Sequence, residues 1–258
     1  MIPPIMPLEW NFDEAETFGP VAGMKIQASD KEGFPLHKHP QGQLVISLKG
    51  AVSCEVAHEL WVVPPQCGVW IPSNTPHSIS TTSEAKLCML YIRPESSTLP
   101  DKCCTIAISP LVRELILDIT DQFSEYSENS LTYRKASILL EELATMPQEN
   151  FCLPISDDPR LYKMLKTLAD NPDDRRTLSA WSSTLAMSHR TLARLIVKET
   201  GLTFGKWRQQ LHLVIALRQL ASGESVQNVA GQLGYDSVNA FIIMFKKFTG
   251  KSPGKYFQ

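Results

Sequence analysis

Three histidines in the first third of the sequence have the spacing of a ligand-binding group. His37 and His39 are two positions apart, so a β-strand would point both imidazoles to the same side. With His77 from a neighbouring strand they could offer nitrogens to Zn, Fe, Ni or Mn, and Gln43 could add a weak oxygen ligand. Since no carboxylate accompanies them, three interpretations stay open: a divalent-metal site, a metal-free pocket whose histidines hydrogen-bond a small ligand, and buried histidines satisfied by the backbone.

Two tryptophans are candidates for the lining of the same pocket. Trp61 and Trp70 both lie in apolar runs of the same segment. Aromatic side chains line many ligand sites, although core packing is their more frequent role. The residues expected to bind an effector are His37, His39, Gln43, His77, Trp61 and Trp70, and the metal ligands among them would be His37, His39 and His77.

Short apolar runs separated by turn residues must position these side chains. Between residues 36 and 93 the runs recur at a spacing of about 8–12 residues, which is typical of an all-β barrel or sandwich. A helical periodicity replaces them after Ser109-Pro110, where a serine cap precedes a proline in the first turn. A second helix is expected over residues 131–144, and residues 148–157 have the composition of a linker.

The C-terminal part of the chain contains an internal repeat with an offset of 49 residues. Each copy has a serine suited to cap a helix, apolar residues four and eight positions later, and a glycine suited to end the helix. Because a short amphipathic stretch and a tight turn precede each copy, a helix-turn-helix is expected twice, at about 177–198 and 225–247. The repeated residues are Ser188, Leu192, Ile196 and Gly201, then Ser237, Phe241, Phe245 and Gly250.

The outward sides of the two repeated helices carry residues suited to DNA. Arg190 and Arg194 are four positions apart, so both could enter a major groove, where an arginine–guanine contact discriminates by ~1–3 kcal/mol. In the second copy Asn239 could contact adenine, whereas Ile242 and Ile243 cannot hydrogen-bond bases, which favours thymine-methyl contact or backbone anchoring. The expected DNA-binding residues are Ser188, His189, Arg190, Thr191, Arg194, Lys198, Ser237, Asn239, Ile243, Lys246 and Lys247.

Charge and composition agree with a DNA-binding C-terminal part. Residues 1–156 carry a net charge of −9 and residues 157–258 carry a net charge of +7, which gives −2 for the whole chain of 258 residues. A polyanion would therefore meet only the C-terminal part. The chain is 43% hydrophobic, which excludes wholesale disorder. No run approaches about 18 apolar residues, and residues 1–7 lack the features of a signal peptide, so a soluble cytoplasmic protein without a membrane partner is expected.

Several short segments of the C-terminal part match the sequence signature of a known family of DNA-binding proteins. They are Met187-Ser188-His189-Arg190-Thr191-Leu192, Glu199-Thr200-Gly201, Gly205-Lys206-Trp207-Arg208, Val229-Ala230, Leu233-Gly234-Tyr235, Phe241, Phe245-Lys246 and Gly250-Lys251-Ser252-Pro253. With them, the stretch from about residue 158 to 257 resembles the DNA-binding domain of AraC/XylS-type bacterial transcription regulators. The resemblance implies a helical domain with two recognition helices in successive segments of the major groove.

The N-terminal half contains a second pattern that points to the same family. In order, it consists of His37-x-His39, Gln43, Gly50, Pro72, Asn74 and His77. This pattern resembles the cupin-like effector domain found in many of these regulators. Gln43 stands where cupins usually have Glu, and Asn74 where Gly is usual.

Together the patterns predict an α+β chain of two domains. Residues 1–104 would form a cupin-like β-barrel, residues 105–147 helices for dimerisation, and residues 158–258 an all-α domain with two helix-turn-helix motifs. The resemblance implies a transcription activator or repressor that binds promoter DNA as a homodimer and responds to a small-molecule effector. No cofactor follows with certainty; a divalent metal in the cupin-like domain is the candidate cofactor, and RNA polymerase is a candidate further partner.

Three alternatives remain beside this interpretation. A cupin metalloenzyme of dioxygenase or isomerase type could carry the DNA-binding domain as an appendage. The C-terminal domain could be an interaction module with degenerate DNA recognition, because of Ile242 and Ile243. Finally, the helices between residues 109 and 144 could pack only on their own barrel and form no dimer contact.

Overall fold

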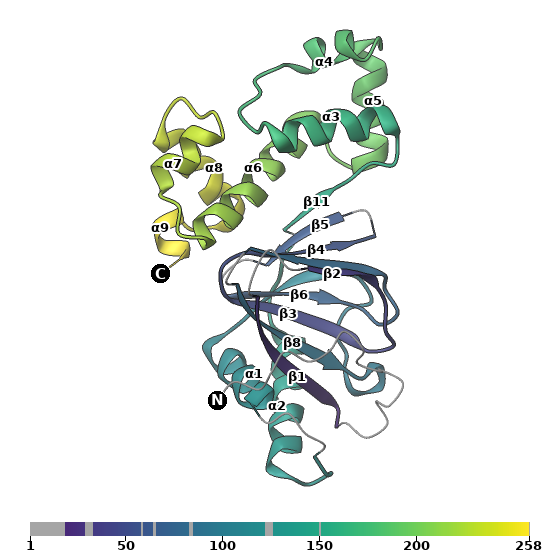
Figure 1. The fold of residues 1–258 in the computed structure, drawn as a ribbon, viewed down its shortest axis with the longest axis vertical. Coiled ribbons are helices and arrows are strands. Elements are labelled where there is room, and N and C mark those ends of the chain that lie inside the picture. The colour runs from purple at the N-terminus through teal and green to yellow at the C-terminus, as the bar shows by residue number, and fades with distance from the viewer. Residues whose placement is uncertain are drawn as a thin grey trace. The chain divides into compact units, whose positions relative to one another are not determined.

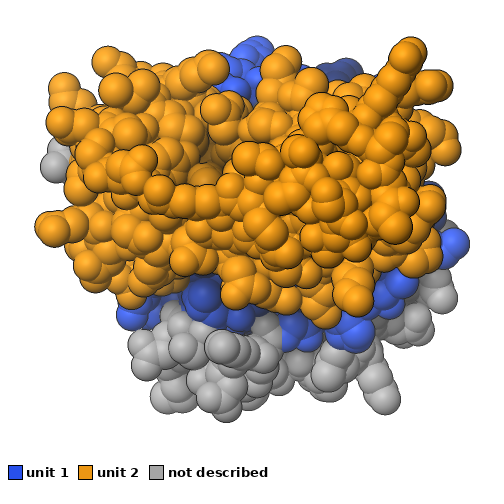
Figure 2. Space-filling view, turned by 90° about the horizontal axis from the view of Figure 1, so that it is seen from above, with its two compact units in different colours: residues 1–57, 63–150 blue, residues 58–62, 151–258 orange. Residues whose placement is uncertain are grey.

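The chain forms two compact units. The computed structural model describes residues 19–28, 33–57, 59–63, 66–82, 85–121, 126–149 and 151–257 (Figure 1). The first unit comprises residues 1–57 and 63–150, and the second residues 58–62 and 151–258 (Figure 2). The expectation about a signal peptide concerns residues 1–7 and lies outside the described residues. Among the helices described, none has the length and apolar character needed to cross a membrane.

The first unit is built on an antiparallel sheet whose neighbouring strands are mostly far apart in sequence. The strand order is β1-β8-β3-β6-β9-β10. β3 lies inside the sheet, since Leu44 pairs with Leu90 of β8 on one side and with Trp70 of β6 on the other. This position agrees with the apolar run of β3, which is buried. The strands are β1 (Val21–Gln27), β3 (Gly42–Lys49), β6 (Cys67–Ile71), β8 (Lys86–Ile92), β9 (Cys104–Ala107) and β10 (Gln148–Glu149).

A second sheet contributes β2 (Gly33–His37), β4 (Val52–Val56) and β7 (His77–Thr81) to the first unit. β7 lies between β2 and β4 and pairs antiparallel with both. The sheet-rich N-terminal fold is confirmed, but the predicted barrel is wrong in one respect, because it is not closed: β1 and β10 are the edges of the first sheet in the described part of the chain. Strand spacing is the same in a barrel and in two sheets, since closure depends on hydrogen bonds between edge strands.

Helices α1 (Pro110–Asp121) and α2 (Leu131–Thr145) pack on one face of the first sheet (Figure 1). α1 begins where the sequence predicts, and Ser109 Oγ accepts a hydrogen bond from the Val112 amide at 3.2 Å. Ile116 and Leu139 are fully buried in the core cluster that the two helices share with this sheet. Burying one such side chain contributes about 1.5–3 kcal/mol, so the helices stabilise the sheet they cover. A short 3-10 turn over Pro94–Ser96 follows β8.

The second unit begins with two short strands. β5 (Glu59–Val63) and β11 (Cys152–Pro154) pair antiparallel, with Trp61 opposite Cys152. The segment 148–157, for which the sequence predicts a linker, therefore contains β10 and β11. β11 also contacts helix α6, because the indole N–H of Trp207 donates to the Pro154 carbonyl at 2.9 Å and the Gln210 side chain donates to the Cys152 carbonyl.

Helices make up the rest of the second unit. Their N-terminal caps confirm the sequence-based expectations: the side chains of Asp158, Thr177, Ser188, Ser225 and Ser237 each accept a hydrogen bond from a backbone amide in the first turn. The helices are α3 (Pro159–Asp170), α4 (Leu178–Thr184), α5 (His189–Thr200), α6 (Phe204–Ala221), α7 (Val226–Gln232), α8 (Val238–Thr249) and α9 (Pro253–Tyr256).

Candidate functional site

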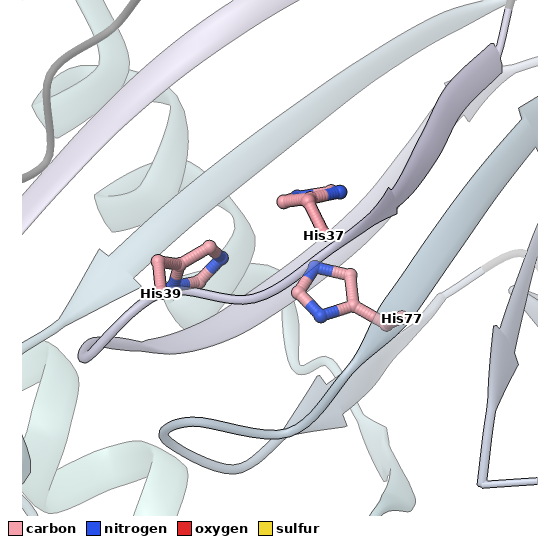
Figure 3. A group of neighbouring side chains, drawn as sticks. All are labelled: His37, His39 and His77. Carbon is pink, nitrogen blue, oxygen red and sulfur yellow. The ribbon is translucent and has the colours of Figure 1, made fainter.

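The first unit brings His37, His39 and His77 together, as the spacing predicts (Figure 3). His37 ends β2 and is the cross-strand partner of His77, the first residue of β7, while His39 follows shortly after β2. One potential ligand atom from each ring lies within 4.8 Å of the others. His39 and His77 are buried, whereas His37 is half-buried.

A backbone carbonyl lies beside the Nδ1 atom of each of these histidines. Nδ1 lies 2.8 Å from the Pro35 oxygen in His37, 2.9 Å from the Gln41 oxygen in His39, and 2.8 Å from the Thr75 oxygen in His77. A carbonyl only accepts hydrogen bonds, so in the neutral rings of His37 and His77 Nδ1 is the protonated nitrogen and Nε2 keeps its lone pair, whereas both ring nitrogens of His39 face an oxygen. Histidines that bind metals have this arrangement, with the second nitrogen held by an acceptor.

The Nε2 atom of His77 is buried and has no hydrogen-bond partner among the described residues. The side chain is only 1% exposed, and its burial lowers the pKa of His77 to about 4. Burial likewise lowers the pKa of His39 below its usual value. Both rings are therefore neutral near pH 7, which is the form that donates a lone pair. A buried acceptor without a partner costs about 1–3 kcal/mol, which a bound ligand would offset.

Gln43 and Tyr91 extend the group towards the interior of the first unit. The carboxamide of Gln43 is 1% exposed, and its oxygen lies 3.3 Å from His39 Nε2. Its nitrogen donates to the Tyr91 hydroxyl at 3.4 Å. Burial raises the pKa of Tyr91, so the phenol stays protonated. No sequence pattern indicates Tyr91, because its place depends on the β3–β8 register that pairs it with Gln43.

The structure does not bring Trp70 together with the histidines. Trp70 pairs with Leu44, the neighbour of Gln43 along β3, so the tryptophan and the carboxamide lie on opposite faces of the sheet. Trp70 packs in the core under α1 and α2, and its indole donates to the Pro100 carbonyl at 2.7 Å. Trp61 lies in β5 of the second unit and is 2% exposed.

In the second unit, the predicted repeat is confirmed as two similar helix-turn-helix motifs, α4–α5 and α7–α8. Ser188 Oγ accepts from the Thr191 amide at 3.1 Å, and Ser237 Oγ accepts from the Ala240 amide at 3.2 Å. The apolar residues four and eight positions after each cap are fully buried. Both second helices end at a glycine in the left-handed conformation, with φ of 70° at Gly201 and 73° at Gly250.

The turn inside each motif also needs a left-handed residue. Ala186 has φ of 50° in the first turn and Gly234 has φ of 72° in the second. A Cβ atom on Gly234 would lie 3.1 Å from the Asp173 Cα atom, so only glycine fits there without movement of the backbone. The guanidinium of Arg175 donates to the Gly234 carbonyl at 2.7 Å and to Asp236 at 2.8 Å. Sequence patterns missed Arg175, because its partners are distant along the chain.

The predicted DNA-binding residues lie on the outward sides of α5 and α8. On α5, the side chains of Arg190 and Arg194 are exposed and make no hydrogen bond or ion pair within the described part of the chain. On α8, Ile243 is 69% exposed. The other exposed residues are His189, Thr191 and Lys198 on α5, with Asn239, Lys246 and Lys247 on α8, and the two caps Ser188 and Ser237. Lys198 lies 3.3 Å from the Glu199 carboxylate, and the Thr191 hydroxyl is bonded to Ser188 at 2.8 Å.

Comparisons with known proteins match both units. A family described as AraC-like ligand binding domain matches residues 25–143, and one described as helix-turn-helix domain matches residues 181–258. The HTH-type transcriptional regulator NimR of Escherichia coli K12 is 47% identical over 228 residues, which are 88% of this chain and 84% of NimR. The HTH-type transcriptional activator RhaR of Mannheimia succiniciproducens is 24% identical over 241 residues, covering 86% of this chain and 87% of RhaR. A solved structure of ToxT from Vibrio cholerae is similar with a TM-score of 0.39 and 11% identity, over 92% of this chain and 98% of ToxT.

The two matched domains define a transcription regulator that joins a ligand-binding domain to a helix-turn-helix DNA-binding domain. The chain belongs to the AraC/XylS family of such regulators. Because these relatives are transcriptional regulators, the enzyme interpretation finds no support among them.

Proposed function

We propose that this regulator binds promoter DNA through α5 and α8, and that the histidine group of the first unit holds the effector. The observation that carries the first part is the pair of equivalent helices, each with a buried apolar side and an exposed polar or basic side. Because its target is promoter DNA, the proposed place of action is the cytoplasm. RNA polymerase is a further partner that this role suggests.

Most of the predicted DNA-binding residues have a stated role in this proposal. Arg190 and Arg194 lie four positions apart on one side of α5, where guanidinium groups can contact guanine in the major groove. Lys198, Lys246 and Lys247 suit backbone phosphates, which position the protein but carry no sequence information. The caps Ser188 and Ser237, with His189 and Thr191, lie at helix N-termini, where backbone amides and the helix dipole favour phosphate.

Replacing Arg194 by Ala tests the base-contacting role of α5. The affinity of the full chain for a duplex enriched from a random-sequence pool is expected to fall by about 1–3 kcal/mol, and base preference at one position to relax. Arg218→Ala is the matched control, because Arg218 is an exposed arginine of α6 in the same unit, and its loss is expected to leave base preference unchanged. Unaltered selectivity in Arg194→Ala would contradict the assignment. Absence of salt-dependent affinity for any duplex would instead favour the interaction-module alternative.

The histidine group is proposed as a divalent-metal site that forms or assists the effector site. Three Nδ1 atoms beside backbone carbonyls, three convergent rings and the buried Nε2 of His77 support this proposal. Imidazole nitrogens suit Zn, Fe, Ni or Mn, and the Gln43 oxygen is a neutral and therefore weak addition. A bound metal would supply a positive charge that an anionic or electron-rich small molecule could join.

Elemental analysis of the purified full chain tests the metal proposal. Near-stoichiometric metal is expected in the natural chain, and its loss is expected in the double variant His37→Ala, His39→Ala. Trp70→Phe is the matched control, since Trp70 lies on the opposite face of the sheet from Gln43. Absence of metal in the natural chain would contradict this proposal and leave a metal-free pocket for a hydrogen-bonding ligand.

We also propose that the chain acts as a homodimer through α1 and α2. Leu131 and Ile138 are 60% and 48% exposed and lie seven positions apart, so they share one side of α2. Leu111 of α1 is 54% exposed. A second copy of this surface is the partner that would cover such apolar side chains in a symmetric contact.

A further inference from the structure

The second helices of the two helix-turn-helix motifs present different chemistry at equivalent positions. The offset of 49 residues matches Arg190 with Asn239 and Arg194 with Ile243. The caps, the buried residues and the terminal glycines coincide at the same offset, so these four side chains occupy equivalent places on their helices. One helix therefore offers two guanidinium groups where the other offers a carboxamide and an alkyl group.

Ile243 differs from the other apolar residues of α8. Phe241, Met244 and Phe245 are buried, and Ile242 is half-buried, whereas Ile243 is 69% exposed. The core of the motif is complete without its side chain. A single exposed apolar residue does not by itself indicate a binding surface, since such residues are common on protein surfaces.

The neighbours of Ile243 indicate what kind of partner covers it. Asn239 lies one helical turn before it, and Lys246 and Lys247 lie one turn after it, all exposed. A partner of this surface must hydrogen-bond a carboxamide, place negative charge near two ammonium groups, and offer an apolar group between them. The major groove of DNA meets these requirements where an adenine edge, a thymine methyl group and the phosphates lie together.

We infer that α8 recognises a thymine through contact between the Ile243 side chain and the 5-methyl group of the base. The inference rests on the proposed function, because it requires α8 to enter the major groove. Side chains one turn apart on a helix have Cβ atoms about 5–6 Å apart, and base pairs are stacked about 3.4 Å apart. The thymine therefore lies one or two base pairs from the base that Asn239 contacts.

Deoxyuridine substitution tests this contact, because deoxyuridine pairs as thymidine does and lacks only the 5-methyl group. The probe is a duplex enriched by the full chain from a random-sequence pool, prepared again with each thymine replaced singly by deoxyuridine. At one thymine the Kd is expected to rise about fourfold, the effect of one lost methyl contact. In Ile243→Ala the difference between thymine and deoxyuridine at that position is expected to vanish.

Val197→Ala is the matched control, since Val197 is an exposed aliphatic residue of α5, and it is expected to keep the difference. Because Ile243 is exposed, Ile243→Ala is expected to keep the urea midpoint of the natural chain. Equal Kd values for every deoxyuridine duplex, or a difference that persists in Ile243→Ala, overturn the inference and leave the proposed function intact. Failure to enrich any duplex, or an enriched duplex that Arg194→Ala binds unchanged, overturns the proposed function and the inference with it.

Discussion

Replacing Gly234 by Ala is expected to weaken the second helix-turn-helix through its turn. Gly234 has φ of 72°, and a left-handed conformation costs an ordinary L-residue roughly 1–2 kcal/mol. The new Cβ would also lie 3.1 Å from Asp173 Cα and 3.3 Å from its carbonyl oxygen, and such overpacking adds about 1 kcal/mol or more. Alanine stiffens the unfolded chain, which returns about 0.4–1 kcal/mol. The net loss of stability is therefore about 1–3 kcal/mol.

The equivalent turn of the first motif supplies a matched variant of opposite sign. Ala186 already holds φ of 50° as an L-residue, so Ala186→Gly removes the conformational cost and is expected to stabilise by up to about 1 kcal/mol. Urea denaturation of the full chain, followed by the helical circular dichroism signal, measures both changes. Stability of Gly234→Ala equal to that of the natural chain, or clear destabilisation of Ala186→Gly, would refute the assignment of strain to these turns.

Two further predictions concern a buried histidine and the surface of α2. Burial lowers the pKa of His212 to about 4, so between pH 6.5 and 4 the unfolded chain binds a proton that the folded chain does not. The contribution of His212 to the free energy of unfolding is therefore fully present above pH 6.5 and falls by up to about 3 kcal/mol as the pH drops to 4. His212→Asn is expected to flatten this pH dependence in urea denaturation. An unchanged pH dependence would contradict the assignment to His212. Ile138→Glu is expected to shift the full chain from dimer to monomer in analytical ultracentrifugation, because it places a charge on the exposed apolar side of α2. A variant that remains dimeric would exclude this side of α2 as the contact.

The features that the sequence predicts well depend on residues close together along the chain. Helix caps such as Asp158 and Ser237 need only a side chain and an amide in the next turn, and both are found as expected. The glycines that end α5 and α8 follow from the same local chemistry. The histidine group was within reach because His37 and His39 are close together in sequence, whereas His77 joins them through the pairing of β2 with β7, which has no local signal.

The features that the sequence does not predict depend on register between distant strands. Trp70 lies away from the histidines because β3 and β6 pair Leu44 with Trp70, and a shift of one residue would have reversed its side of the sheet. Tyr91 joins Gln43 for the same reason. The open edges of the sheet and the pairing of β11 with β5 are also non-local, so neither the absence of closure nor the strand inside residues 148–157 has a local signal.

The division of the chain into its two units has a consequence for how they are connected. Residues 58–62 belong to the second unit although the strands before and after them, β4 and β6, belong to the first. The backbone therefore passes between the units three times, after residues 57, 62 and 150, and a single hinge does not describe the connection. His77 pairs with Val56, the last residue of β4, and β5 pairs with β11, which is bonded to α6. The second unit is therefore not one continuous stretch of chain, and a fragment that begins at residue 151 lacks β5, the strand that pairs with β11.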